Sequence, residues 1–249
     1  MNLKKLLTIG TLPLIWLLYI LFELITGRIQ DFQTIIFNII IMLLFALSGL
    51  IIYKIGINNE SGLLFKNLLI TFLIFMLIDQ GIKIIIKLFY FDNHIELIPN
   101  MLSFHPIINT NGSWLNARFG TGVSFPLLII LNIIALFLFI EIYRYYLYNN
   151  HKDFWTDMCF VFIFSGALCS LIDKIFYGGS LDFIGISNLF IADIKDIYIN
   201  LGILFFVVAL FNSGYLKTET ETTMKEDIEN IKKFIYFIKN DLSGKYKLF

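Results

Sequence analysis

Charge is scarce in this 249-residue chain. Only 15% of its residues are charged and its mean hydropathy is +0.79, whereas a soluble domain carries roughly 25% charged residues. A globule with so few charges cannot cover its surface with polar groups, so part of the protein must face lipid. The 19 basic and 19 acidic residues balance, which argues against a nucleic-acid partner because nucleic-acid binding needs a basic face.

Cysteine is almost absent as well. Cys159 and Cys169 lie in one apolar stretch, separated by roughly 15 Å along a helix that rises about 1.5 Å per residue. That separation is too long for a disulfide bond, and no cysteine spacing typical of a metal site is present. We therefore expect two buried thiols, and no metal or organic cofactor is indicated.

Long apolar stretches are the abundant feature. A membrane-spanning helix needs about 20 mostly apolar residues, and six stretches qualify. They run from about Leu6 to Ile25, Thr34 to Tyr53, Leu64 to Phe89, Phe125 to Tyr148, Phe154 to Leu171 and Ile197 to Phe211. The sequence predicts an all-α integral membrane protein with about six transmembrane helices and a small outward-facing extramembrane region.

Basic residues in the short loops predict the orientation, because cytoplasmic loops carry an excess of Lys and Arg. Such residues precede the first span, fill the second-to-third and fourth-to-fifth loops, and dominate the tail. Both termini are therefore expected in the cytoplasm, and the segments at about 26–33, 90–124 and 172–196 are expected outside. Within the tail, apolar residues from about Met224 to Asn240 follow one helical stripe, which predicts an amphipathic helix resting on the bilayer or the protein; a partner-binding helix is the alternative.

Ionisable residues inside apolar spans are costly and usually functional. Asp79 and Lys83 lie four positions apart in the third stretch, so they share a helical face and can pair. The fifth stretch ends in GALCSLIDK, which combines small residues that permit close helix packing with Ser170, Asp173 and Lys174. Each group has a structural reading as a neutral pair or an interfacial anchor, and a functional reading as part of a site.

Three aspartates, Asp182, Asp193 and Asp196, follow in the last outward segment. They are either solvated loop residues or a catalytic group. Two carboxylates held close together share one proton. The ionised member can then take a proton from water while the protonated member polarises a carbonyl and protonates the leaving amine. Asn109, in an earlier outward loop with an Asn-Gly turn signal, is the other polar candidate there.

Taken in order, these segments resemble the signal peptidase II family from about Ile70 to Leu210. The run Leu77–Lys83 is similar to the family's L-D-Q-x-x-K motif. Counted from Pro99 and Trp114, Asn109 matches the asparagine of the loop motif N-x-G-A-A-F/W; a match on Asn111-Gly112 would need a shift of two residues. GALCSLIDK is similar to G-A-L-G-N-L-x-D-R, and Asp182-Phe183-Ile184 follows at the family's spacing.

The last motif allows two alignments. Asp196 has Gly202 six positions on, as does the aspartate of the family's F-N-x-A-D motif, and this match puts Asp193 in place of the family's asparagine. Ala192-Asp193 matches the letters A-D but misplaces the glycine. The first alignment makes Asp196 the second catalytic residue and is the one we prefer.

The resemblance implies a signal peptidase II-like catalytic core at residues 61–215, two additional N-terminal helices at 1–60 and a cytoplasmic tail at 216–249. It implies an aspartic endopeptidase of the bacterial cell membrane that cuts lipid-modified prolipoproteins before the lipobox cysteine, with that substrate and membrane lipid as partners. Catalysis would fall to Asp182 and Asp196. Binding or supporting roles would fall to Asn109, Asp193, Asp79, Lys83, Asp173, Lys174 and Ser170.

Several residues depart from the family pattern. Ser170 and Lys174 stand where the family has Asn and Arg, and Asp193 stands where it has Asn. A catalytically silent relative that binds lipopeptides or assists a membrane complex is therefore the main alternative. A small transporter is a further one, but inverted repeats would support it and the sequence has none.

Overall fold

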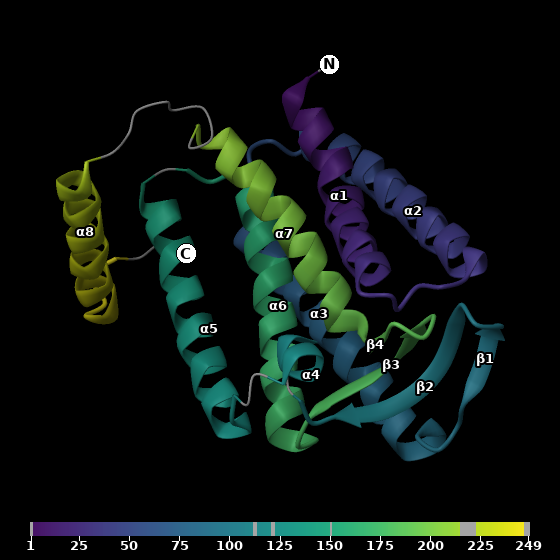
Figure 1. The fold of residues 1–249 in the computed structure, drawn as a ribbon. Helices are drawn as coiled ribbons and strands as arrows, with labels where there is room; N and C mark the ends of the chain where they lie inside the picture. Colours follow the sequence, from purple (N-terminus) through teal and green to yellow (C-terminus); the bar gives the residue numbers. More distant parts are fainter. Residues whose placement is uncertain (1, 112–113, 121–122, 150, 215–222, 247–249) are drawn as a thin grey trace.

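The computed structural model describes residues 2–111, 114–120, 123–149, 151–214 and 223–246. Within them, six helices are long and apolar enough to cross a membrane, as the sequence predicted. They are α1 (Leu3–Ile25), α2 (Phe32–Ile57), α3 (Phe65–Ile85) with its π-helical extension η1 (Ile86–Tyr90), α5 (Phe125–Tyr148), α6 (Phe154–Phe176) and α7 (Ile194–Asn212). The protein is thus a multi-pass membrane protein, and Figure 1 shows the six helices side by side.

The centre of the bundle is the pair α6 and α7, and glycines let the two helices approach closely. A Cβ atom at Gly202 would lie 2.4 Å from Cγ1 of Ile163, and one at Gly166 would lie 2.7 Å from Cγ1 of Ile199. Real Cβ atoms do not make such contacts, so this packing needs glycine at both positions. The expected packing role of Gly166 is confirmed.

The N-terminal helices α1 and α2 form a hairpin that packs on α7. Here too a glycine permits the contact, since a Cβ at Gly49 would lie 2.5 Å from the carbonyl oxygen of Thr8. Asp31 begins α2 by accepting a hydrogen bond from the backbone N–H of Thr34 at 2.7 Å, which satisfies one of the free N–H groups of the first turn. The hairpin is therefore part of the packed bundle.

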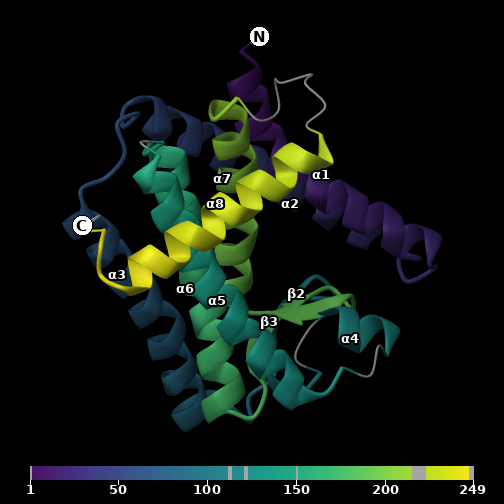
Figure 2. The ribbon, with the colours of Figure 1, turned by 90° about the vertical axis from the view of Figure 1, so that its left-hand side faces the viewer.

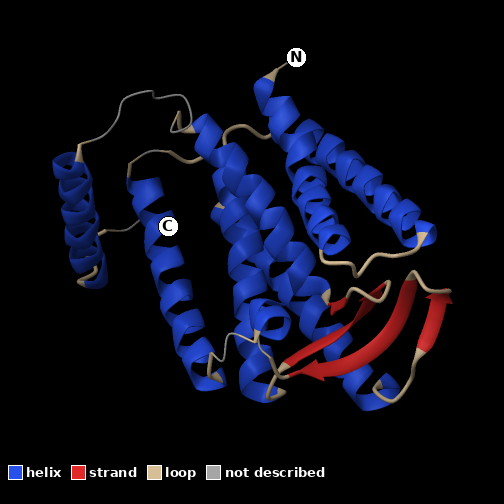
Figure 3. Ribbon diagram, viewed as in Figure 1, coloured by secondary structure: helices blue, strands red, loops and turns tan. Residues whose placement is uncertain are grey.

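The segments expected outside contain a small antiparallel sheet, which the sequence did not predict. Its strands are β1 (Ile95–Ile98), β2 (Leu102–Asn109), β3 (Ser180–Ile186) and β4 (Phe190–Ala192), paired in that order. Figure 3 shows it at the end of the bundle away from the N-terminus, near the short helix α4 (Trp114–Phe119). The register of β2 with β3 places Asn109 opposite Ser180 and Ile107 opposite Asp182, and so joins segments far apart in sequence.

The tail forms the helix α8 (Met224–Leu242), as its amphipathic pattern predicted. It lies against the outer side of α5 (Figure 2), where Phe237 is buried and Arg144 forms an ion pair with Asp241 at 2.5 Å. Ile228, Ile231 and Ile235 remain exposed, so the helix keeps an uncovered apolar side.

The predicted boundary between the core and the tail, at residue 216, falls within residues 215–222, outside the described residues. The division into domains stays a prediction.

Candidate active site

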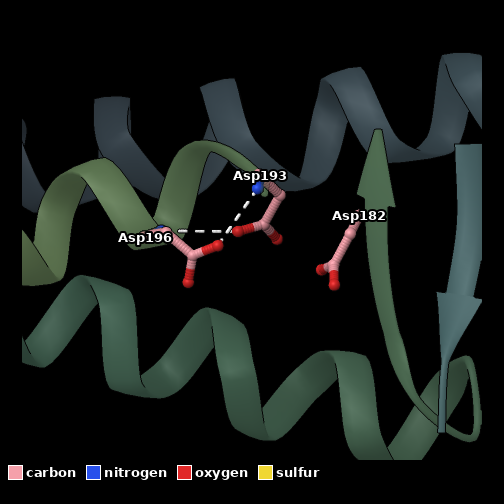
Figure 4. Close-up of side chains that lie close together, drawn as sticks. All are labelled: Asp182, Asp193 and Asp196. Carbon is pink, nitrogen blue, oxygen red and sulfur yellow. Dashed lines mark hydrogen bonds between the residues drawn. The ribbon is translucent and has the colours of Figure 1, made fainter. Parts of the chain in front are cut away.

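Strand β3 and the start of helix α7 bring the predicted aspartates together. Asp182 lies on β3, Asp193 precedes the first residue of α7 as its N-cap, and Asp196 lies in the first turn of that helix. One carboxylate oxygen of each residue lies within 4.8 Å of the corresponding oxygens of the other two, and Figure 4 shows Asp193 between its two neighbours. Asp182 and Asp193 are buried and Asp196 is half-buried, so these are not solvated loop residues.

The start of α7 explains the positions of two of them. Asp193 accepts a hydrogen bond from the backbone N–H of Asp196 at 3.3 Å, and Asp196 accepts one from the backbone N–H of Asp193 at 3.1 Å. This reciprocal capping box satisfies backbone donors that the first helical turn leaves free. The last span was expected to begin near Ile197, whereas α7 begins at Ile194 because the polar cap extends the helix beyond its apolar part.

Asp182 is held by two side-chain donors. The Oγ of Ser180 donates to its Oδ1 at 2.5 Å, and the Nδ2 of Asn109 donates to its Oδ2 at 3.0 Å. The ammonium of Lys195 lies 3.6 Å from the same Oδ1. Burial raises the pKa of the Asp182 carboxyl, while Lys195 and Ser180 oppose that rise.

Asp193 differs from the other two aspartates because it is ion-paired. Its carboxylate lies 2.6 Å from the ammonium of Lys83 and also contacts the ammonium of Lys195. Burial acts to raise the pKa of Asp193, but Lys195 and Lys83 outweigh it and hold that pKa below its ordinary value. Asp193 is therefore the neutralised member of the three, which favours Asp182 and Asp196 as the dyad.

Lys83 is the centre of a buried ion network rather than half of a pair. Its ammonium lies 2.8 Å from Asp79, 2.7 Å from Asp173 and 2.6 Å from Asp193. Lys83, Asp79 and Asp173 have no exposed side-chain surface. The expected Asp79–Lys83 pair is present, but the network also ties α3 to α6 and to the start of α7.

Asp173 and Lys174 are neighbours in the sequence but have different partners. Adjacent helical residues point in different directions, and Asp173 turns to Lys83 while the ammonium of Lys174 bonds to Oγ of Ser170 at 2.5 Å. Both lie inside α6, which continues to Phe176 beyond the expected end at Leu171. Ser170 therefore acts as the partner of Lys174.

Two residues of the site were missed by the sequence analysis. Lys195 donates to Oγ of Ser180 and to Asp193, and its ammonium lies 3.4 Å from Asp173. A signal existed for Ser180, because residues two apart on a strand share a face and Ser180 stands two before Asp182. For Lys195 the available signal was its position between Asp193 and Asp196 in the sequence.

Comparisons with known proteins match the part of the chain that carries this site. The family model for signal peptidase (SPase) II matches residues 70–212. The chain belongs to the signal peptidase II family. A lipoprotein signal peptidase of Microcystis aeruginosa is 25% identical over 117 residues, which cover 46% of this chain and 71% of that protein. A lipoprotein signal peptidase of Staphylococcus haemolyticus is 26% identical over 155 residues, which cover 60% of this chain and 93% of that protein.

A solved structure shares the fold of this chain. It is described as a bacterial membrane enzyme structure obtained by the in meso method at 2.3 Å resolution, and it matches with a TM-score of 0.51 and 22% identity. The match covers 66% of this chain and 99% of that one. The resemblance seen in the sequence is thereby confirmed for the family and the fold. Gly112 and Ser113 of the loop motif lie outside the described residues.

The hairpin α1–α2 lies outside the family match, yet it contacts α4 and the turn between β3 and β4. Glu23 of α1 is fully buried, 3.3 Å from Arg28 and 3.6 Å from Arg118 of α4. Arg28 also donates to the backbone oxygens of Asn188 at 3.0 Å and Leu189 at 2.5 Å, in the turn between β3 and β4. The additional hairpin therefore braces both α4 and the turn that leads to the aspartates.

The three carboxylates are also spaced closely enough to hold a cation. Lys83 and Lys195 already contact Asp193, so much of the negative charge that a divalent ion would require is balanced. We therefore assign no metal to the site.

Proposed function

We propose that this protein is an aspartic endopeptidase that removes signal peptides from diacylglyceryl-modified prolipoproteins, cutting just before the lipobox cysteine. One observation carries the proposal: Asp182 and Asp196, from two separate elements, present carboxylate oxygens within 4.8 Å of each other. That spacing admits one water molecule between two carboxyl groups. Membership of the family supports the peptidase and the lipoprotein substrate.

The proposed chemistry needs one ionised and one protonated carboxyl. The ionised carboxylate takes a proton from the bound water as the water oxygen adds to the scissile carbonyl carbon. The protonated carboxyl hydrogen-bonds the carbonyl oxygen and then gives its proton to the leaving nitrogen as the C–N bond breaks. Asn109, whose amide donates to Asp182, orients that carboxylate, and its own Oδ1 accepts the backbone N–H of Asn111 at 3.1 Å.

The location of the site suits a lipid-anchored substrate. A diacylglyceryl group is embedded in the bilayer, so the bond next to it lies at the membrane surface. The dyad lies where α7 begins, beside the sheet, at one end of the spanning bundle. We propose that this end faces outward from the bacterial cytoplasmic membrane and that both termini are cytoplasmic, with membrane lipid as a further partner.

Orientation can be tested with single cysteines, because both native cysteines are buried. Asn93 precedes β1 and Asn59 lies between α2 and α3, and both side chains are exposed. A cysteine at Asn93 should react in intact cells with an impermeant thiol reagent, and one at Asn59 should react only after lysis. The reverse labelling would place the aspartates on the cytoplasmic side and contradict the proposal.

Activity can be tested with purified protein and a prolipoprotein that carries the diacylglyceryl group. Mass spectrometry should show cleavage before the modified cysteine, and the unmodified precursor should remain intact. Asp182→Asn serves as the inactive control. The feature that favours a silent relative is Asp193, which stands beside the dyad at the position where the family has asparagine. Binding of the lipid-modified precursor without cleavage would establish that alternative instead.

A further inference from the structure

A chain of hydrogen bonds ends on one member of the dyad. Lys195 donates from its ammonium to Oγ of Ser180, and Ser180 donates from that hydroxyl to Oδ1 of Asp182. We propose that Lys195 and Ser180 are positioning residues that keep Asp182 ionised, so that Asp182 accepts the proton of the attacking water and Asp196 carries the dyad's proton. This inference rests on the proposed function and assigns roles within the same site.

The contacts of the two carboxylates are unequal. Asp182 accepts hydrogen bonds from Ser180 and Asn109 and has an ammonium at 3.6 Å. Among the described residues, the side chain of Asp196 accepts only the backbone N–H of Asp193 and takes part in no ion pair. Hydrogen bonds and a cation favour the charged form of an acid. A single proton shared by this dyad therefore belongs on Asp196.

Lys195 can supply a positive charge because it is itself paired. It is buried, and its ammonium contacts Asp193 and lies 3.4 Å from Asp173. A buried lysine without such partners would lose its proton. The Ser180 hydroxyl has one hydrogen, and its contact with Asp182 at 2.5 Å is much shorter than its contact with Asp173 at 3.5 Å. The hydroxyl therefore passes the influence of the ammonium to Asp182.

Other charged side chains lie near Asp182 and affect its protonation in the parent protein and in every variant. They come from each helix of the site: Asp79 and Lys83 on α3, Asp173 and Lys174 on α6, and Asp193, Lys195 and Asp196 at α7. Lys83 and Lys174 have their own nearest partners, Asp193 and Ser170. Lys195 is the ammonium that forms an ion pair with Asp182 among the described residues, so its removal is the most direct perturbation.

The proton inventory is complete with these two carboxyl groups. Water gives one proton to Asp182 as its oxygen bonds to the carbonyl carbon, and Asp196 gives one proton to the leaving nitrogen as the C–N bond breaks. After cleavage Asp182 is protonated and Asp196 is ionised. The proton returns to Asp196 across the short gap between their oxygens, directly or through the next water, and the starting state is restored.

The pH profile of cleavage tests the assignment, because the acid limb of kcat/KM reports protonation of the base in the free enzyme. Ser180→Ala removes a hydrogen bond to a charged group and should move the acid limb upward by about one pH unit. Lys195→Met should move it in the same direction, and Lys195→Arg should restore part of the shift. Matched controls are Ser103→Ala on β2 and Lys87→Met, whose ammonium lies over the ring of Tyr177; neither should move the limb.

A double-mutant cycle separates a relay from a direct effect of charge. If Lys195 acts through Ser180, Lys195→Met should shift the acid limb much less in the Ser180→Ala background than in the unchanged protein. Equal shifts in the two backgrounds would overturn the relay. Lys195→Met also removes ion pairs with Asp173, Asp182 and Asp193 and can fail to fold; in that case Ser180→Ala, which retains Lys195, still tests whether the hydroxyl keeps Asp182 ionised.

A measurement without substrate keeps the inference separate from the proposed function. Infrared titration of the purified protein follows carboxyl protonation, and the band lost in Asp182→Asn identifies Asp182. Its midpoint should rise in Ser180→Ala and stay unchanged in Ser103→Ala. An unchanged midpoint in Ser180→Ala overturns the inference even if the protein cleaves its substrate. Absence of cleavage overturns the proposed peptidase function, while the infrared result still decides which carboxyl is ionised.

Discussion

Replacing Lys83 by methionine is the sharpest test of the buried ion network. Methionine retains most of the side-chain length but removes an ammonium that contacts Asp79, Asp173 and Asp193 at 2.6–2.8 Å. These carboxylates would then depend on Lys195, which contacts Asp193 and lies 3.4 Å from Asp173. Breaking a buried ion pair from one side costs about 3–5 kcal/mol. That range corresponds to roughly two to nearly four orders of magnitude in the unfolding equilibrium.

The comparison with Asp79→Asn makes the reasoning specific. Asp79 forms an ion pair with Lys83. Its carboxylate also accepts a hydrogen bond from Nε2 of Gln80 at 2.9 Å and one from the backbone N–H of Lys195 at 3.1 Å. An asparagine can still accept hydrogen bonds through its amide oxygen, so Asp79→Asn should cost less than Lys83→Met. The double variant should recover only part of the loss, because Asp173 and Asp193 still lack their ammonium.

The free energy of unfolding can be measured by titrating the detergent-solubilised protein with sodium dodecyl sulfate and following tryptophan fluorescence. Lys87→Met controls for the loss of a lysine at the same end of the third span. If the free energy of unfolding of Lys83→Met lies within about 0.5 kcal/mol of the parent value, the range of ordinary surface changes, the ion network does not stabilise the protein as argued. Full recovery in the double variant would show that Asp79 and Lys83 form an isolated pair.

Three further predictions concern the dyad, the cap and the helix contact. Asp182→Asn and Asp196→Asn should each lower the cleavage rate by about 10²–10⁴-fold or more with unchanged folded yield. Asp193→Asn should still cleave. An inactive Asp193→Asn variant together with an active Asp196→Asn variant would show that Asp193, and not Asp196, is the second catalytic residue. The ion pairs of Asp193 hold its pKa down, so their stabilisation should be present above its unfolded pKa of about 3.9 and be lost as pH falls through the lower folded value. This loss should be absent from the pH dependence of unfolding in Asp193→Asn. Gly202→Ala should destabilise the protein by about 1–3 kcal/mol, measured in the same detergent titration, because its Cβ would meet Ile163 at 2.4 Å; an unchanged stability would show that α6 and α7 can separate freely.

Apolar length and motif spacing were enough to predict the spans and the meeting of the aspartates. The number of spans depends on apolar composition, which the chain shows clearly. The spacing from Asp196 to Gly202 distinguished Asp196 from Asp193, and the structure adds a physical difference, since Asp193 is neutralised by two lysines. The catalytic assignment itself stays a prediction.

The pairing of segments that lie far apart in the chain could not be predicted from the sequence. Asn109 meets Asp182 because β2 pairs with β3. Apolar and polar residues alternate only over Leu102–His105 and Ser180–Phe183, and such short alternation does not indicate which strands pair. The start of α7 was misplaced because its capping box continues the helix beyond the apolar residues. The end of α6 was misplaced because Asp173 and Lys174, which interrupt the apolar run, find partners in Lys83 and Ser170. The Lys195–Ser180 contact joins the start of α7 to β3. No local sequence pattern indicates with which of several carboxylates each lysine forms an ion pair.

The distribution of charges over the three site helices has a consequence for how the protein enters the membrane. Each helix brings both signs: Asp79 with Lys83 on α3, Asp173 with Lys174 on α6, and Lys195 with Asp196 on α7. A membrane protein is made from its N-terminus, so α3 is synthesised before its partners and must be tolerated in lipid alone. Its charges are four residues apart and can neutralise each other during that interval.

Lys83 keeps Asp79 and gains further partners when the later helices arrive. Its contact with Asp173 requires α6, and its contact with Asp193 requires the start of α7. The same arrival of α7 delivers Asp196 to Asp182. Charge balance in the bundle and assembly of the dyad are thus completed by one event, so a nascent chain that has not yet inserted its last span holds neither a balanced interior nor two opposed aspartates.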